Sequence, residues 1–66
     1  MGLKFTDPET GNAWNLFGDS QGDYWLADNS GHLEGPMTAV RVAGYLVRQL
    51  GLHRDDYGKV FEWLGL

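Results

Sequence analysis

The chain contains no cysteine. Disulfide bonds and thiolate zinc sites, which often stabilise very small domains, are therefore excluded. The two histidines, His32 and His53, match no metal-ligand spacing, so we expect neither a metal ion nor another cofactor. A chain of about 60 residues buries only ~60% of the surface that it exposes when unfolded, so the core must be small or completed by a second copy or a partner.

Long apolar runs are also absent. The first ten residues, MGLKFTDPET, turn polar at once, and no run approaches the ~20 apolar residues that span a bilayer. We therefore expect a cytoplasmic protein without a signal peptide or membrane span.

Positive charge is scarce. The sequence has five Lys and Arg residues against nine Asp and Glu residues, which gives a formal net charge of −4. The acids concentrate in the first half, where a single base, Lys4, accompanies six of them. These six acids are Asp7, Glu9, Asp19, Asp23, Asp28 and Glu34. They either solubilise the protein or form a docking surface.

What the chain does have is aromatic and apolar residues in short segments. LKFT, AWNLF and DYWLA are separated by the turn-forming stretches DPETGN and GDSQG. This pattern predicts a three-stranded antiparallel meander over residues 3–28. We expect one α+β domain, residues 1–66, in the order β-β-β-α-α.

Two amphipathic helices are predicted after the sheet, over residues 37–50 and 54–64, and both pack on one face of it. Pro36 fits the first turn of the earlier helix, although Thr38 is an alternative N-cap. Gly51 and Gly65 fit the left-handed residues that end helices. Asp55 and Asp56 fit the first turn of the second helix, where the helix dipole favours carboxylates.

Trp25 is the most informative residue, because its face of the sheet depends on strand register. Pairing Phe5 with Trp14 and Leu3 with Leu16, and then Leu16 with Tyr24 and Trp14 with Leu26, puts all six apolar residues on one face. Trp25 then lies on the outer face, with Phe17 diagonal to it. It either forms a contact surface, since tryptophan is enriched at binding hot spots, or covers its own sheet or is covered by Lys4. A slip of one residue would bury Trp25 instead.

No catalytic constellation is present. There is no phosphate-binding loop with a lysine, no nucleophile elbow and no His-Glu-x-x-His pattern. His32 beside Asp28 or Glu34 fits a turn with local hydrogen bonds better than an acid–base pair. The second helix of a helix-turn-helix would carry Asp55, Asp56 and Glu62, which disfavours DNA binding. We therefore expect no enzymatic activity.

The predicted meander suggests where a partner would bind. Its first turn and the turn-forming stretch DNSGH, which follows the third strand, lie at one end of the sheet. This brings together Asp7, Glu9, Asp28 and Glu34, while Asp19 and Asp23 lie at the other end. With Trp25 and Phe17, these acids form a candidate surface for a basic partner, with salt-sensitive binding. A compact chain of this length spans roughly 28 Å, over which duplex DNA carries about 16 charges, so the acids can imitate only a short phosphate stretch.

The overall profile is similar to that of small phage-encoded inhibitors of bacterial defence, anti-CRISPR proteins in particular. The resemblance lies in the short, cysteine-free, acidic and aromatic chain and in no specific motif, so it transfers no functional residue. It implies a stoichiometric inhibitor without a cofactor that occupies a nucleic-acid-binding surface of a defence complex. The alternative is a homodimeric structural or regulatory module, which would use the outer sheet face with Trp25 and Phe17.

Overall fold

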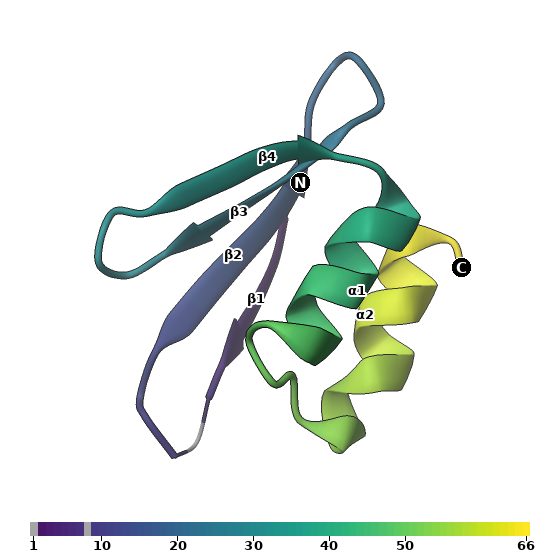
Figure 1. Cartoon of the computed structure of the whole chain (residues 1–66). Helices are drawn as coiled ribbons and strands as arrows, with labels where there is room; N and C mark the ends of the chain where they lie inside the picture. The colour runs from purple at the N-terminus through teal and green to yellow at the C-terminus, as the bar shows by residue number, and fades with distance from the viewer. Residues whose placement is uncertain (1, 8) are drawn as a thin grey trace.

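A computed structural model describes residues 2–7 and 9–66. Met1, the first residue of the predicted domain, and Pro8, which belongs to its predicted first turn, lie outside the described residues. The chain folds as an α+β structure, as expected, with a four-stranded antiparallel sheet in the order β1-β2-β3-β4. Figure 1 shows both helices on one side of this sheet. The elements are β1 (Gly2–Thr6), β2 (Ala13–Gly18), β3 (Tyr24–Asp28), β4 (Leu33–Met37), α1 (Ala39–Arg48), the 3-10 helix η1 (Arg54–Asp56) and α2 (Tyr57–Leu64).

The fourth strand corrects the expected count of three. Leu33–Met37 pairs antiparallel with β3 at the edge of the sheet, so Pro36 belongs to a strand and not to a first helical turn. An edge strand tolerates proline because one row of its backbone groups has no ladder partner. Gly35 and Pro36 lie where the register shifts opposite Tyr24 and Leu26. Proline is common in the first helical turn, so the sequence predicted a helix start at Pro36.

Helix α1 begins later than predicted. Thr38 is its N-cap, and the Thr38 hydroxyl accepts a hydrogen bond from the Arg41 amide at 3.2 Å, which confirms the alternative start. After the helix ends at Arg48, Gly51 has a φ of 64° and the Leu52 amide bonds to the Leu46 carbonyl. This left-handed residue turns the chain toward η1 and α2.

Helix α2 begins at Tyr57 and is preceded by η1, so Asp55 and Asp56 lie in the 3-10 helix and not in the first α-helical turn. Gly65 is the left-handed C-cap of α2, with a φ of 78°, as predicted.

The register of the first hairpin is confirmed, whereas that of the second is shifted by two residues. Phe5 pairs with Trp14, and their rings stack with centroids 5.6 Å apart. In the second hairpin Leu16 pairs with Leu26, and Phe17 lies directly opposite Trp25, not diagonal to it. Because side chains alternate with a period of two, the shift leaves every residue on its expected face. Trp25 therefore lies on the outer face, as predicted.

The shifted position of the second turn has a local cause. Oδ1 of Asp19 accepts hydrogen bonds from the amides of Gln21 at 2.8 Å and Asp23 at 3.0 Å. The Asp19 amide also donates to the Asp23 carbonyl, at 2.9 Å. The turn thus spans residues 19–23 and is centred on Gln21, whereas the predicted pairing of Leu16 with Tyr24 would centre it one residue earlier.

The core lies between the inner sheet face and the helices. Four of its side chains, Leu16, Val42, Leu46 and Val60, are fully buried. Partly buried aromatic residues close its margins, among them Tyr24 and Trp63, whose rings meet edge to face at 5.7 Å. No helix covers the opposite face of the sheet in Figure 1. Among the described residues, neither helix is long and apolar enough to cross a membrane.

Candidate functional site

Trp25 is held against its own sheet. Its indole Nε1 donates a hydrogen bond to Oδ2 of Asp19 at 2.8 Å. Its ring lies so close over β4 that a Cβ added to Gly35 would stand 2.8 Å from two ring carbons. Trp25 is therefore half-buried. Of the two alternatives, the geometry matches a tryptophan that covers its own sheet, with Asp19 and Gly35 as neighbours and not Lys4.

Asp19 is a structural residue of the β2–β3 loop. The Trp25 indole, followed by the Asp23 amide, lowers the pKa of the Asp19 carboxyl by hydrogen bonding to its charged form. Asp23 is half-buried, and its carbonyl oxygen accepts a hydrogen bond from the Asp19 amide. Both acids lie at the end of the sheet opposite the β1–β2 and β3–β4 loops, as predicted. Trp25 bonds to Asp19 at that end, so it does not join the other four acids.

Asp28 organises the β3–β4 loop. Its Oδ1 accepts hydrogen bonds from the Ser30 hydroxyl at 2.8 Å, the Ser30 amide at 3.0 Å and the His32 amide at 2.9 Å. These hydrogen bonds lower the pKa of the Asp28 carboxyl, with the largest effect from the Ser30 hydroxyl and the next from the His32 amide. Nε2 of His32 in turn contacts the Glu34 carboxylate at 2.7 Å. His32 thus makes the local hydrogen bonds that were expected of a turn histidine.

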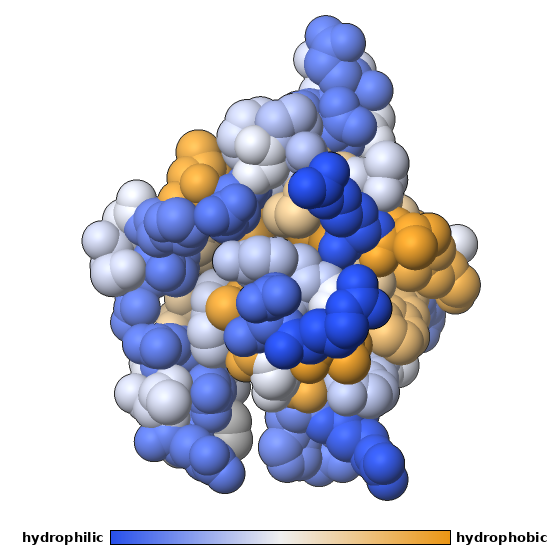
Figure 2. Space-filling model, in the orientation of Figure 1, coloured by the Kyte–Doolittle hydropathy of each residue, from blue (hydrophilic) through white to orange (hydrophobic). Residues whose placement is uncertain are grey.

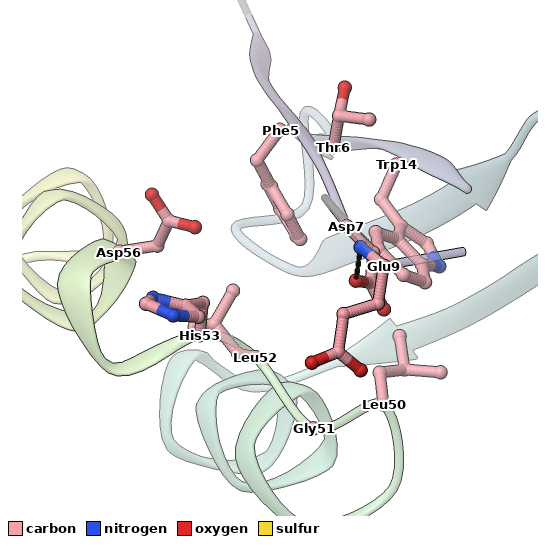
Figure 3. A pocket seen from close by; sticks show the side chains of 10 residues that line it. All are labelled: Phe5, Thr6, Asp7, Glu9, Trp14, Leu50, Gly51, Leu52, His53 and Asp56. Carbon is pink, nitrogen blue, oxygen red and sulfur yellow. Dashed lines mark hydrogen bonds between the residues drawn. The ribbon is translucent and has the colours of Figure 1, made fainter. Parts of the chain in front are cut away.

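Asp7 and Glu9 belong to the β1–β2 loop. Oδ1 of Asp7 accepts the Glu9 amide at 2.8 Å, as Figure 3 shows. Both residues line a cavity of about 110 Å³ between this loop and the segment that joins α1 to α2. In Figure 2 the mouth of the cavity is the hollow between the two blue lobes at the bottom of the molecule.

The four acids expected at one end of the sheet form two pairs. Asp7 and Glu9 line the 110 Å³ cavity, whereas Asp28 and Glu34 line a smaller space of about 20 Å³ beside α1. Trp14 borders both spaces. The strand directions place both loops at the same end, but the twist of the sheet spreads them apart in Figure 1.

Sequence reasoning missed part of this end of the molecule. Trp14, Leu50, His53 and Asp56 also line the larger cavity. Trp14 was assigned only to the core, and Asp56 only to a helix start. No local pattern relates the β1–β2 loop to the segment after α1, because their meeting depends on how the helices dock on the sheet.

Among residues 2–7 and 9–66, no three His, Cys, Asp or Glu side chains are grouped so that they could hold a metal ion. No family model matches the chain. No curated protein and no solved structure matches it either. The surfaces of this chain are therefore the basis for its functional assignment.

Proposed function

We propose that this chain is a small acidic protein-binding module that acts as a stoichiometric inhibitor. It occupies a basic, nucleic-acid-binding surface of a partner, such as a CRISPR effector complex, in the cytoplasm of the cell where that complex works. The proposal requires no cofactor and no catalysis by this chain.

The observation that carries the proposal is the orientation of Asp7 and Asp28 in the two loops at one end of the sheet. In each residue, Oδ1 accepts hydrogen bonds from the loop backbone. Oδ2 of each accepts none from any residue between 2 and 7 or 9 and 66. One oxygen therefore fixes the loop, and the other remains as an oriented acceptor for a cationic group.

Fixed carboxylates suit an inhibitor because the binding free energy is not spent on ordering them. They present negative charge at set positions, as phosphate oxygens do, and arginine and lysine side chains recognise both. The molecule measures 33 × 26 × 20 Å and carries nine acids, which is too few to imitate a full duplex. These dimensions and this number of acids support imitation of a few consecutive backbone phosphates in one basic groove of the partner.

The second candidate function is a homodimeric structural or regulatory module. The observation in its favour is the uncovered outer face of the sheet, where Leu33 is 52% exposed beside Ala27. Phe17 and Trp25 extend this apolar area along the neighbouring strands. The two candidates differ in chemistry, because the inhibitor binds through carboxylates and the homodimer through apolar contacts.

The test is a pull-down with the tagged chain from a bacterial lysate that contains active defence complexes, with the captured proteins identified by mass spectrometry. We expect capture of a nucleic-acid-guided complex that is lost at high salt and on addition of the complex's own target nucleic acid. The variant D7K/D28K removes the oriented acceptors and should abolish capture. The control E62K reverses one exposed carboxylate on α2, which matches the change of charge in each of the single variants D7K and D28K, and it should capture normally.

Two results contradict the proposal. The first is capture that persists in high salt and in the presence of competing nucleic acid. The second is capture of nothing except untagged copies of the same chain, which favours the homodimer.

A further inference from the structure

The cavity between the β1–β2 loop and the α1–α2 segment has apolar walls. Phe5 and Trp14 form a stacked aromatic pair on the sheet side, and Leu50 and Leu52 close the helix side. Phe5 and Leu52 are only 7% and 8% exposed, so the walls belong to the core of the protein. A void with such walls forfeits the dispersion contacts that a filled space would have, so occupation of it stabilises the fold.

The rim of the cavity determines the charge of its occupant. Glu9 reaches it from the β1–β2 loop and Asp56 from η1, so the two carboxylates come from opposite walls (Figure 3). Lys59 lies 3.8 Å from Oδ1 of Asp56 and partly neutralises it. The Glu9 carboxylate makes no ion pair or hydrogen bond with any of the described residues. Glu9 is therefore available to a ligand, together with Oδ2 of Asp7, which also lines the cavity and accepts no hydrogen bond from the described residues.

His53 makes its contacts within η1. Its Nδ1 lies 3.2 Å from the Asp55 amide, which caps η1, and 3.5 Å from Oδ2 of Asp55. The cavity thus combines an aromatic wall with a negative rim.

We infer that this cavity receives the guanidinium group of an arginine side chain that the basic partner presents. The inference rests on the proposed function for the source of that arginine, but the recognition chemistry belongs to the cavity. An apolar cavity of roughly 150 Å³ holds a benzene molecule, so 110 Å³ fits the smaller, planar guanidinium. The guanidinium stacks on the face of Trp14 and forms a charge-assisted pair with Glu9. Lysine has no planar, bidentate group that could stack on Trp14 and pair with Glu9 in this way, so it should bind more weakly.

The experiment titrates the full ¹⁵N-labelled chain with N-acetyl-argininamide and follows the indole N–H signals of its three tryptophans. Substitutions W14F and W63F assign these signals. We expect the Trp14 signal to shift and to saturate, while the Trp25 and Trp63 signals stay in place. N-acetyl-citrullinamide has nearly the same shape without the charge and should bind at least tenfold more weakly. N-acetyl-lysinamide should also bind several-fold more weakly.

The variant E9Q should weaken binding of N-acetyl-argininamide several-fold. The matched control E62Q removes an exposed carboxylate on α2, outside the cavity lining, and should bind as the wild type does. The inference is overturned if Trp14 does not respond, if citrulline or lysine binds as well as arginine, or if E9Q has no effect.

These outcomes are distinguishable from failure of the proposed function. If the pull-down succeeds and the arginine probe does not bind, the inhibitor proposal stands and its contacts lie elsewhere. If the probe binds and the pull-down fails, the cavity remains an arginine site and the assigned partner is wrong.

Discussion

The indole nitrogen of Trp25 donates a hydrogen bond to Asp19 across a distance of 2.8 Å, which links the outer face of the sheet to the β2–β3 loop. The same carboxylate accepts two loop amides through its other oxygen. One aspartate therefore fixes both the length of the loop and the position of the largest side chain on the outer face. This relationship explains why Trp25 is half-buried although it points away from the core.

Replacement of Asp19 tests this link. The variant D19A removes the acceptor for the Trp25 indole and for the amides of Gln21 and Asp23. We expect a lower Tm and a Trp25 indole signal that shifts and exchanges faster with water. The Trp14 signal should remain in place because Trp14 pairs with Asp28, at the opposite end of the sheet. An unchanged Trp25 signal in D19A would show that the hydrogen bond does not hold the ring.

Gly35 provides a second test of how Trp25 is seated. It has a φ of 145°, and an added Cβ would lie 2.8 Å from the Trp25 ring and 2.9 Å from the Tyr24 carbonyl. We expect G35A to destabilise the protein by about 1–3 kcal/mol through backbone strain, and by more in total because the steric clash adds to the strain. Chemical denaturation measures this difference.

The control for G35A is G11A. Gly11 also has a positive φ, 76°, but no atom lies within 4 Å of its added Cβ. This variant should therefore lose only the part that is due to backbone strain. Equal losses in the two variants would mean that the contact between Gly35 and Trp25 adds nothing to stability.

The sequence predicted the parts of the fold that local patterns determine. The alternation of apolar residues put Trp25 on the correct face even though the second hairpin is two residues out of the predicted register. Gly51 and Gly65 adopt the left-handed conformations that their positions indicated. These features depend on side-chain periodicity and on backbone preferences, which are properties of short segments.

The fourth strand and the 110 Å³ cavity could not be predicted in the same way. The segment LEGPM contains glycine and proline, which are rare in strands, so its sequence does not indicate a strand. It forms one because Met37 pairs with Tyr24 and Glu34 pairs with Leu26. The cavity joins Glu9 and Asp56, which are far apart in the sequence and meet only when the helices dock on the sheet. Both features are tertiary, and no single segment encodes them.

The acidic limb of stability should depend on Asp19 and Asp28. Hydrogen bonds lower the pKa of each carboxyl below its usual value of 3.8. A lowered pKa in the folded state means that the unfolded state binds more protons, so stability rises with pH in this range. The contribution is fully present above pH 3.8 and is lost as the pH falls through the folded pKa values.

We therefore expect the Tm of the wild type to be steady near neutral pH and to fall below about pH 4. The variant D19N/D28N should have a lower Tm at neutral pH and a smaller decrease in acid. Thermal unfolding followed by circular dichroism between pH 7 and pH 2 would compare the two profiles. Parallel profiles would show that other carboxyls control the acid limb.

Gly58 offers a change in the opposite direction. It lies within α2, and no atom stands within 4 Å of an added Cβ. Because glycine in a helix costs roughly 0.5–1 kcal/mol relative to alanine, G58A should increase the free energy of unfolding by about that amount. Denaturant titration measures the gain. A loss of stability would mean that Gly58 is needed for close packing, which the described contacts do not show.

The oligomeric state separates the two candidate functions, and Leu33 is the better residue for the test. Trp25→Ala would disturb the fold, because Trp25 bonds to Asp19 and covers Gly35. Leu33 is 52% exposed on the same face. The face of a sheet with four strands of about five residues measures roughly 300 Å², whereas a standard interface buries about 800 Å² from each partner.

We therefore expect the wild type to sediment as a monomer at micromolar concentration, and L33S to do the same with little change in Tm. The homodimer predicts instead a dimer in high salt that L33S dissociates. Analytical ultracentrifugation of both proteins at low and high salt distinguishes these cases. A salt-resistant dimer sensitive to L33S would transfer the functional surface from the carboxylates to the outer face of the sheet, and Asp7 and Asp28 would then serve only to shape their loops.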